Sequence, residues 1–174
     1  MTKVNADNFD AFQSPNYPVL AKAGVNIKYK KQYVKKASHY QIKAHSNLSN
    51  NVSILKLFPS IRKEVVISIL NSSKGIILET FGSGNAMSEE WFLRLLKQAI
   101  DKGIVIVNVT QCKGGGVDQS KYESGNSLEA IGVISGGDIT FEAAITKLML
   151  LLGGKTITEK IKRKFLSPFC GEIS

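Results

Sequence analysis

The sequence predicts an α/β fold in which a parallel sheet is flanked by helices. Residues 75–80 (GIILET) and 104–110 (IVIVNVT) are short and almost continuously apolar, as expected of parallel strands buried on both faces. Between and after these runs, apolar residues recur with helical spacing, so strands and helices alternate along the chain. A chain of 174 residues is long enough to bury one such core.

The start of the chain shows no regular pattern, because residues 1–13 have neither helical nor strand periodicity. Ser14 and Pro15 favour the start of a short helix, and Gly24 would end it. We therefore expect a short helix here, before one domain over residues 25–174. Within that domain, VNIKYK alternates as a strand does, and QIKAHS (41–46) is its expected partner.

The remaining elements follow from apolar spacing and from capping residues. Apolar residues three and four positions apart define the inner face of each helix, and serine or aspartate before a helix can cap its amino end. The expected elements are a strand at 51–58, a helix from Ser60 to Leu70, a strand at 75–80, a helix from Ser88 to Gly103, a strand at 104–110, a short helix at 127–130, a long helix from Asp138 to Gly153 and an amphipathic piece at 158–165.

The net charge of +9 is concentrated in the first third of the chain. Residues 1–63 hold 11 Lys or Arg against two acids, whereas the remaining residues hold 12 of each sign. The densest part, KYKKQYVKK (28–36), interleaves tyrosines with lysines. A nucleic-acid contact therefore stays open beside the alternative of a solvated hairpin or linker.

Two polar, glycine-rich loops mark the place where a ligand would bind. FGSGNAM follows Thr80, and QCKGGGVDQSKYESGN follows Thr110. In open α/β sheets, ligands bind beyond the carboxyl ends of the strands, where both loops begin. The two cysteines are too few for a disulfide scaffold, and no run of about 18 apolar residues predicts a membrane span.

The first loop does not predict a nucleotide site. Gly82 and Gly84 begin like a dinucleotide fingerprint, but Met87 stands where the third glycine would be. No Walker A lysine occurs, and His39 and His45 lie outside both loops and near no cysteine. We therefore expect neither a cofactor nor a metal.

The loops also lack a complete set of catalytic groups. No histidine is nearby to serve as a base, and Lys113 and Lys121 are either possible bases or ordinary solvated loop lysines. The possible nucleophiles are Thr80, Ser83, Thr110, Cys112 and Ser120. Asn85 offers a donor and an acceptor suited to an amide or a carboxylate, or it caps its own turn. Asp118 and Glu123 are either ligand carboxylates or ordinary loop charges. The residues alone predict a polar ligand site made by two loops.

Several motifs in order resemble the C-terminal half of the cytoplasmic, type I L-asparaginases. They are GIILETFGSGNA, IVIVNVTQC, the tyrosine and glycine of KYESGN, and LEAIGVISGGDITFEAAITKLMLLL. FDAFQSPNYPVLAKAGVNIKY is similar to the segment that joins the two domains of that family, so the resemblance implies an interdomain linker with a short helix over residues 1–24 and the C-terminal α/β domain over residues 25–174. The resemblance implies a Rossmann-like, three-layer α/β/α domain with a small, mostly parallel sheet.

The resemblance also implies what such a domain contributes. The family hydrolyses L-asparagine to L-aspartate and ammonia, using threonines in TGGTI-like and HGTDT-like motifs of a larger N-terminal domain. Neither motif occurs here, so we expect a C-terminal domain that is inactive by itself. It would complete the substrate site and the dimer interface of a cytoplasmic homodimer or tetramer, without cofactor, nucleic acid or membrane.

Five site residues follow from the resemblance. Asn85, in the GxGN motif, is the residue expected to contact the substrate, and Tyr122 and Glu123 are further candidates for that role. Cys112 matches a cysteine that contributes to an allosteric asparagine site in some bacterial relatives. Glu79 stands where an arginine of that site aligns, so binding of the asparagine carboxylate should be weaker here.

Two alternative functions remain open at this stage. One is the asparaginase-like subunit of the tRNA-dependent amidotransferase, which acts on glutamine beside a tRNA-binding partner; the short linker and the TQC cysteine favour the asparaginase. The other is an independent module that binds a small molecule or a nucleic acid. The basic first third could also pair with acids of the N-terminal domain.

Overall fold

A four-stranded parallel sheet lies at the centre of the molecule. The computed structural model describes residues 1–34, 44–119, 123–154 and 158–174. The strands lie in the order β5 (Val52–Lys56), β6 (Gly75–Thr80), β7 (Val105–Thr110) and β8 (Ile134–Ser135), and all neighbours are parallel. The helices within the described residues are α1 (Lys63–Ser72), α2 (Glu90–Asp101), α3 (Glu123–Ala130), α4 (Phe141–Gly153) and α5 (Thr158–Leu166).

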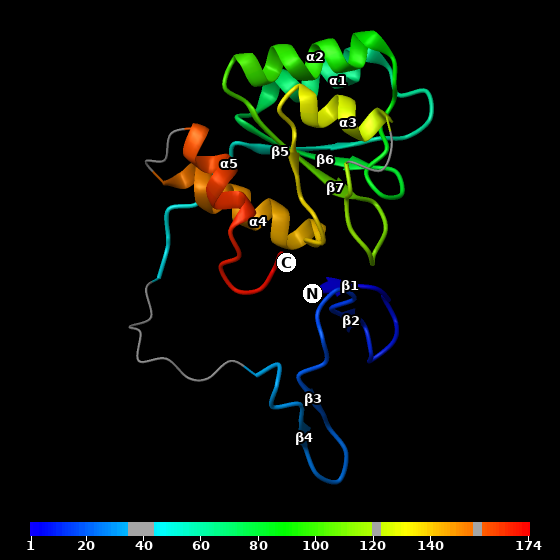
Figure 1. Cartoon of the computed structure of the whole chain (residues 1–174), viewed down its shortest axis with the longest axis vertical. Helices are drawn as coiled ribbons and strands as arrows, with labels where there is room; N and C mark the ends of the chain where they lie inside the picture. The colour runs from blue at the N-terminus through cyan, green and yellow to red at the C-terminus, as the bar shows by residue number, and fades with distance from the viewer. Residues whose placement is uncertain (35–43, 120–122, 155–157) are drawn as a thin grey trace.

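The helices cover both faces of this sheet. Figure 1 shows α1, α2 and α3 on one face and α4 and α5 on the other. Successive residues of β6 and β7 alternate between two apolar cores: Ile76 and Leu78 pack with α1 and α2, while Ile77 and Val107 pack with α4 and α5. This arrangement confirms the predicted α/β fold with helices on both faces of a parallel sheet.

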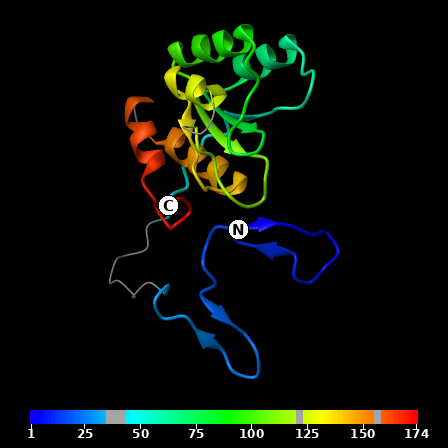
Figure 2. The same ribbon diagram turned by 45° about the vertical axis from the view of Figure 1, so that its right-hand side comes forward.

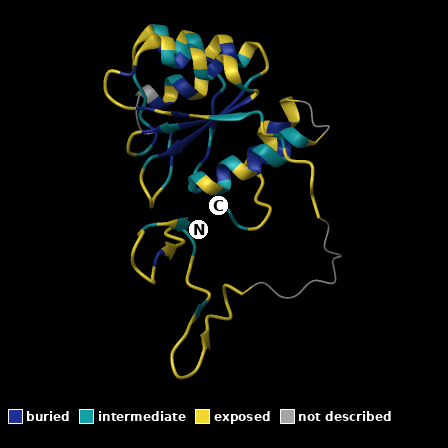
Figure 3. Ribbon diagram, turned by 180° about the vertical axis from the view of Figure 1, so that it is seen from behind, coloured by how far each residue is buried: buried dark blue, intermediate teal, exposed yellow. Residues whose placement is uncertain are grey.

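The arm, which we define as residues 1–34, lies beyond the carboxyl edge of the sheet (Figure 2). It contains two antiparallel pairs of two-residue strands. β1 (Thr2–Lys3) pairs with β2 (Phe12–Gln13), and β3 (Ala21–Lys22) pairs with β4 (Lys28–Tyr29). The arm's exposed surface is visible from behind in Figure 3.

The short helix expected after Ser14 does not form. Residues 14–17 make a turn, in which the Tyr17 N–H donates to the Ser14 carbonyl (3.1 Å), and the chain then enters β3. The Asn16 side chain is hydrogen-bonded to Gly115 and Asp138 instead of lying in a helix. A helix this short is stable only when packing supports it, and the residues here are mostly exposed.

The strand expected at 25–30 is shorter and has a different partner. Only Lys28–Tyr29 forms a strand, and it pairs with β3 rather than with residues 41–46. Residues 41–43 lie outside the described residues, and residues 44–46 form no strand.

The caps of three helices also differ from prediction. The N-cap residues are Arg62, Glu89 and Thr140, rather than Ser60, Ser88 and Asp138. Of these three, Thr140 caps with its side chain, which accepts from the Ala143 N–H. Serine and aspartate also favour turns, so each of the three predicted residues lay within two positions of the observed N-cap without marking it.

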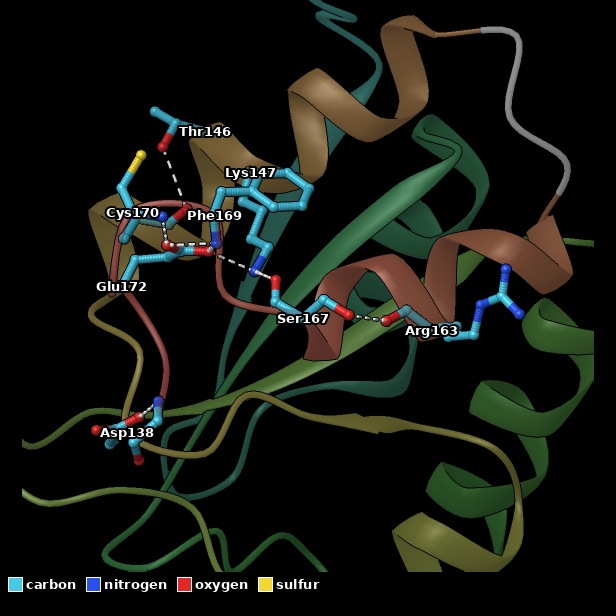
Figure 4. Close-up of polar contacts among 10 residues, drawn as sticks. Asp138, Thr146, Lys147, Arg163, Ser167, Phe169, Cys170 and Glu172 are labelled. Carbon is cyan, nitrogen blue, oxygen red and sulfur yellow. Dashed lines mark hydrogen bonds and ion pairs between the residues drawn. The ribbon is translucent and has the colours of Figure 1, made fainter. Parts of the chain in front are cut away.

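A buried lysine holds the carboxyl-terminal segment against α4. The Lys147 side chain is only 3% exposed, and its Nζ donates to Glu172 Oε1 (2.5 Å) and to the Ser167 carbonyl (2.8 Å), as Figure 4 shows. The rings of Phe165 and Phe169 lie 5.2 and 4.6 Å from the same nitrogen. The charge is therefore paired on one side and faces aromatic rings on the other.

The same contacts change the pKa of Glu172. Burial raises the pKa of this carboxyl, but hydrogen bonds from Lys147 and from the backbone N–H groups of Phe169 and Cys170 outweigh burial, and the pKa falls from 4.5 to about 2. A carboxyl whose pKa is lowered by folding stabilises the protein above its ordinary pKa. That contribution is lost as the pH falls from about 4.5 towards 2.

We expect the free energy of unfolding to show this titration. The gap between 4.5 and about 2 corresponds to about 3 kcal/mol. Urea unfolding should show that Glu172→Gln destabilises the chain near neutral pH and that its difference from wild type shrinks as the pH is lowered through this range. The control Glu159→Gln, at an exposed carboxylate of α5, should show no such trend. A difference for Glu172→Gln that does not change with pH would contradict the assignment.

Candidate functional site

The candidate site begins where β6 and β7 end side by side. The register places Thr80, the last residue of β6, opposite Thr110, the last residue of β7. The loops that follow these strands therefore start at the same edge of the sheet, as the sequence predicted.

A buried polar pair joins the two strands just before this edge. Thr80 Oγ1 donates to Asn108 Oδ1 (2.6 Å), and both side chains are 0% exposed. Asn108 Nδ2 in turn lies 3.4 Å from the carbonyl of Gly84 in the first loop. Because the pair is shielded from water, it fixes the end of β6 and the loop after it relative to β7.

The first loop is a tight turn closed by its own backbone. The N–H of Phe81 donates to the Asn85 carbonyl (2.9 Å), and the N–H of Asn85 donates to the Phe81 carbonyl (2.8 Å). Gly84 has a φ of 113°, and a Cβ there would lie 2.8 Å from Val117 Cγ1, so the close approach requires glycine. Thr110 Oγ1 donates to the Gly82 carbonyl (2.5 Å) and so holds the turn from the second strand.

This geometry positions Asn85 and does not favour a phosphate site. Asn85 is half-buried at the end of the turn, and its amide nitrogen would lie 3.9 Å from a Cβ on Gly82. The helix after the loop begins at Glu90 with Glu89 as its N-cap residue, and two negative charges at this end disfavour a bound anion. The loop therefore suits recognition by an amide better than binding of a phosphate.

Glu79 and Cys112 line a separate pocket of about 160 Å³. The arm contributes Thr2 and Asn16 to this pocket, and the amino end of α4 contributes Thr140 and Glu142; Asn85 is not among its lining residues. Glu79 is largely buried, and its carboxylate lies 3.7 Å from Lys56 Nζ. The structure thus brings the two predicted allosteric residues together, apart from Asn85.

The other two predicted residues are described only in part. Tyr122 lies outside the described residues. Glu123 is the first residue of α3, and its side chain is not described. Their expected contact with a substrate therefore stays a prediction.

Two residues near these loops were missed by the sequence analysis. The Asn16 side chain donates to the carbonyls of Gly115 (2.6 Å) and Asp138 (2.7 Å) and accepts from the Gly115 N–H, so it ties the arm to the second loop. Gln119 is 4% exposed, and within the described residues both polar atoms of its amide lack a hydrogen-bond partner. For Asn16, the Pro-Asn sequence is typical of a turn and could have indicated a structural role. Nothing in the sequence indicates that Gln119 is buried.

Gln119 stands at the junction between the two loops. The neighbouring residue, Asp118, donates its backbone N–H to the Ser83 carbonyl in the first loop (2.9 Å). Burying an amide without partners costs stability, so such a group in a native protein calls for an explanation such as strain, a ligand or a bound water.

The described residues show neither a metal cluster nor a membrane span. In that part of the chain, no group of three or more His, Cys, Asp or Glu residues could hold a metal ion. Cys112 and Cys170 are exposed free thiols. None of the described helices is long and apolar enough to cross a membrane.

Comparison with known families gives a match over most of the chain. The Glutaminase/Asparaginase C-terminal domain family matches residues 51–165. L-asparaginase 1 of Escherichia coli K12 is 38% identical over 174 residues, which are 99% of this chain and 52% of that protein. The chain thus spans about half the length of this relative. These matches confirm the resemblance that the sequence motifs predicted.

Other relatives carry different names. The 60 kDa lysophospholipase of Mus musculus is 39% identical over 95% of this chain and 30% of its own length. A glutamyl-tRNA(Gln) amidotransferase subunit of Metallosphaera sedula is 32% identical over 99% of this chain and 39% of its own length.

Solved structures agree with these matches. The crystal structure of L-asparaginase I from Vibrio cholerae superimposes with a TM-score of 0.91 at 36% identity, covering 99% of this chain and 53% of that one. The probable cytoplasmic L-asparaginase from Campylobacter jejuni superimposes with a TM-score of 0.71 at 25% identity, covering 96% and 50%.

Removing the Thr80 hydroxyl should cost stability because Asn108 would lose its buried partner. We expect Thr80→Val to lower the free energy of unfolding by about 1–3 kcal/mol, measured by urea denaturation. The control Thr146→Val changes an exposed threonine of α4 in the same way and should have an effect within about 0.5 kcal/mol. Equal effects of the two variants would contradict the role of the buried pair.

Replacing Gln119 should have the opposite effect. Gln119→Met removes two unpaired polar atoms at similar volume, so we expect the free energy of unfolding to rise by about 1–3 kcal/mol. Gln98→Met, at an exposed position of α2, serves as the control and should be close to neutral. A loss of stability in Gln119→Met would show that the amide has a partner in the folded chain.

Proposed function

The chain belongs to the Glutaminase/Asparaginase C-terminal domain family, and we propose that it is the C-terminal domain of an enzyme that hydrolyses L-asparagine to L-aspartate and ammonia. The observation that carries this proposal is the match to L-asparaginase 1 of Escherichia coli over 99% of the chain, supported by the TM-score of 0.91 to the Vibrio cholerae enzyme. In the described residues, two loops begin at the carboxyl edge of the sheet, and they do not contain a complete set of catalytic groups.

We infer that this domain completes a substrate site whose nucleophile lies on another domain. Asn85 is the contributing residue in this proposal, because the backbone of the 81–85 turn and the Thr80–Asn108 pair hold it at the carboxyl edge of the sheet. Its amide can donate to a carboxylate or accept from an ammonium group, the two charged groups of an amino-acid substrate. Tyr122 and Glu123 are proposed as further contacts on the second loop.

The pocket that contains Glu79 and Cys112 is the proposed place of an allosteric asparagine site. Two carboxylates, Glu79 and Glu142, line it, whereas Lys113 Nζ donates to the Val4 carbonyl (3.0 Å). A free amino acid would bring its own carboxylate next to these groups. We therefore propose that asparagine binds weakly here, with little allosteric effect.

The assembly and location of the enzyme are part of the same proposal. We propose a cytoplasmic homodimer or tetramer that contains an N-terminal catalytic domain, with no cofactor and no nucleic acid. The name of the Campylobacter jejuni structure supports the cytoplasmic location. A glutamine-specific amidotransferase subunit is the second candidate, and the identity to the Metallosphaera sedula protein together with the basic first third favours it.

A hybrid enzyme tests the proposal. This chain would replace the matching half of Escherichia coli L-asparaginase 1, and ammonia release from L-asparagine and L-glutamine would be measured. We expect activity with asparagine, and Asn85→Ala should lower kcat/KM by about 10- to 100-fold through loss of a hydrogen bond to a charged group. Asn71→Ala, at an exposed position of α1, is the matched control and should leave activity unchanged.

Two results would contradict the proposal. Ammonia release by this chain alone would show that it holds its own catalytic set. A folded hybrid that hydrolyses glutamine but not asparagine would favour the amidotransferase reading instead.

A further inference from the structure

The Thr110 hydroxyl is shared by the two loops of the candidate site. As a donor it bonds to the Gly82 carbonyl in the first loop (2.5 Å). As an acceptor it receives the N–H of Cys112 at the start of the second loop (3.0 Å). A threonine hydroxyl has one proton to donate and two lone pairs, so it makes both bonds at once. One small group therefore joins the two loops.

The strand that carries this hydroxyl leaves it little freedom. Thr110 is the last residue of β7, lies opposite Thr80 in the parallel register and is buried. The next residue, Gln111, donates its N–H to the Thr80 carbonyl (3.0 Å). Its side-chain amide donates to the carbonyls of Leu57 (2.7 Å) and Glu79 (3.0 Å), at the ends of β5 and β6. The hydroxyl thus lies among three strand ends that are tied together.

The bond from Thr110 reaches the part of the first loop that lies next to the Asn85 side chain. Gly82 has a φ of 49°, and a Cβ added to it would lie 3.9 Å from Asn85 Nδ2. The backbone bonds between Phe81 and Asn85 close the turn on itself, whereas the Thr110 bond ties it to the sheet. The second side-chain bond from β7 to this loop, from Asn108 Nδ2 to the Gly84 carbonyl, is longer at 3.4 Å and hence weaker.

We propose that Thr110 is a positioning residue for substrate binding, which acts through Asn85 rather than by touching the substrate. Its hydroxyl fixes the distance between the 81–85 turn and the end of β7, and with it the direction of the Asn85 amide. Without the hydroxyl, the Gly82 carbonyl and the Cys112 N–H would lose their partner, and both loops would be free to shift. The inference rests on the proposed function, in which Asn85 binds the charged groups of an amino acid.

Two substitutions separate this role from packing. Thr110→Val keeps nearly the same shape without the hydroxyl, and Thr110→Ser keeps the hydroxyl. In the hybrid with Escherichia coli L-asparaginase 1, we expect Thr110→Val to raise KM for L-asparagine by about 3- to 10-fold at nearly unchanged kcat, because substrate binding is weakened by about one hydrogen bond. Thr110→Ser should keep KM within about twofold of wild type.

Ile161→Val is the matched control for a loss of stability. Ile161 is buried in the core on the side of α4 and α5, so removing one of its methylene groups destabilises the chain away from both loops. We expect this variant to have the KM of wild type.

Two measurements on the 174-residue chain itself need no enzyme activity. The side-chain amide resonances of Asn85, followed by NMR, should move in Thr110→Val and stay in place in Thr110→Ser and Ile161→Val. Exchange of the Cys112 N–H with solvent should become about tenfold faster in Thr110→Val, because this amide loses its acceptor.

The outcomes distinguish the positioning role from the proposed function. An active hybrid in which Thr110→Val has the KM of wild type would overturn the positioning role and leave the proposed function intact. An equal rise of KM in Thr110→Ser or Ile161→Val would also overturn it, as would Asn85 resonances that do not move in Thr110→Val. An inactive hybrid would count against the proposed function, whereas Asn85 resonances that move in Thr110→Val alone would still support the positioning of Asn85.

Discussion

The hydrogen bond between Thr80 and Asn108 is the interaction on which the candidate site depends. Both side chains are fully buried near the carboxyl edge of the sheet, and the hydrogen bond between them offsets much of the cost of burying their polar groups. The pair helps to fix the register of β6 and β7 at their carboxyl ends. Asn108 also reaches the first loop, and its own carbonyl accepts from the Gly136 N–H beyond β8 (2.8 Å). Three segments are thereby held at one edge.

The two sides of the molecule are stabilised in different ways. On the side of α1, α2 and α3 the sheet is covered by an apolar core, next to which the Thr80–Asn108 pair is buried. On the side of α4 and α5, the charge of Lys147 is buried next to that apolar core and is matched by Glu172. A buried ion pair adds little net stability compared with apolar packing, but breaking it is costly, so it specifies where the carboxyl-terminal segment must lie.

The sheet and the arm differ in how far their apolar residues are covered. The parallel sheet needs no partner, because both its faces are covered. The arm, in contrast, exposes apolar residues beside the edge where the candidate site begins.

By itself the sequence determined the elements whose signal is local. The continuous apolar runs of β6 and β7 and the apolar faces of the helices follow from periodicity, and ordered motifs such as FGSGN identified the family and the edge that carries the site. Only the tertiary structure decided that Lys147 and Gln119 are buried, that Glu79 and Cys112 share a pocket apart from Asn85, and that the arm forms two hairpins instead of a helix. These features depend on contacts between residues far apart in the chain, such as Asn16 with Asp138, and no local pattern encodes such contacts.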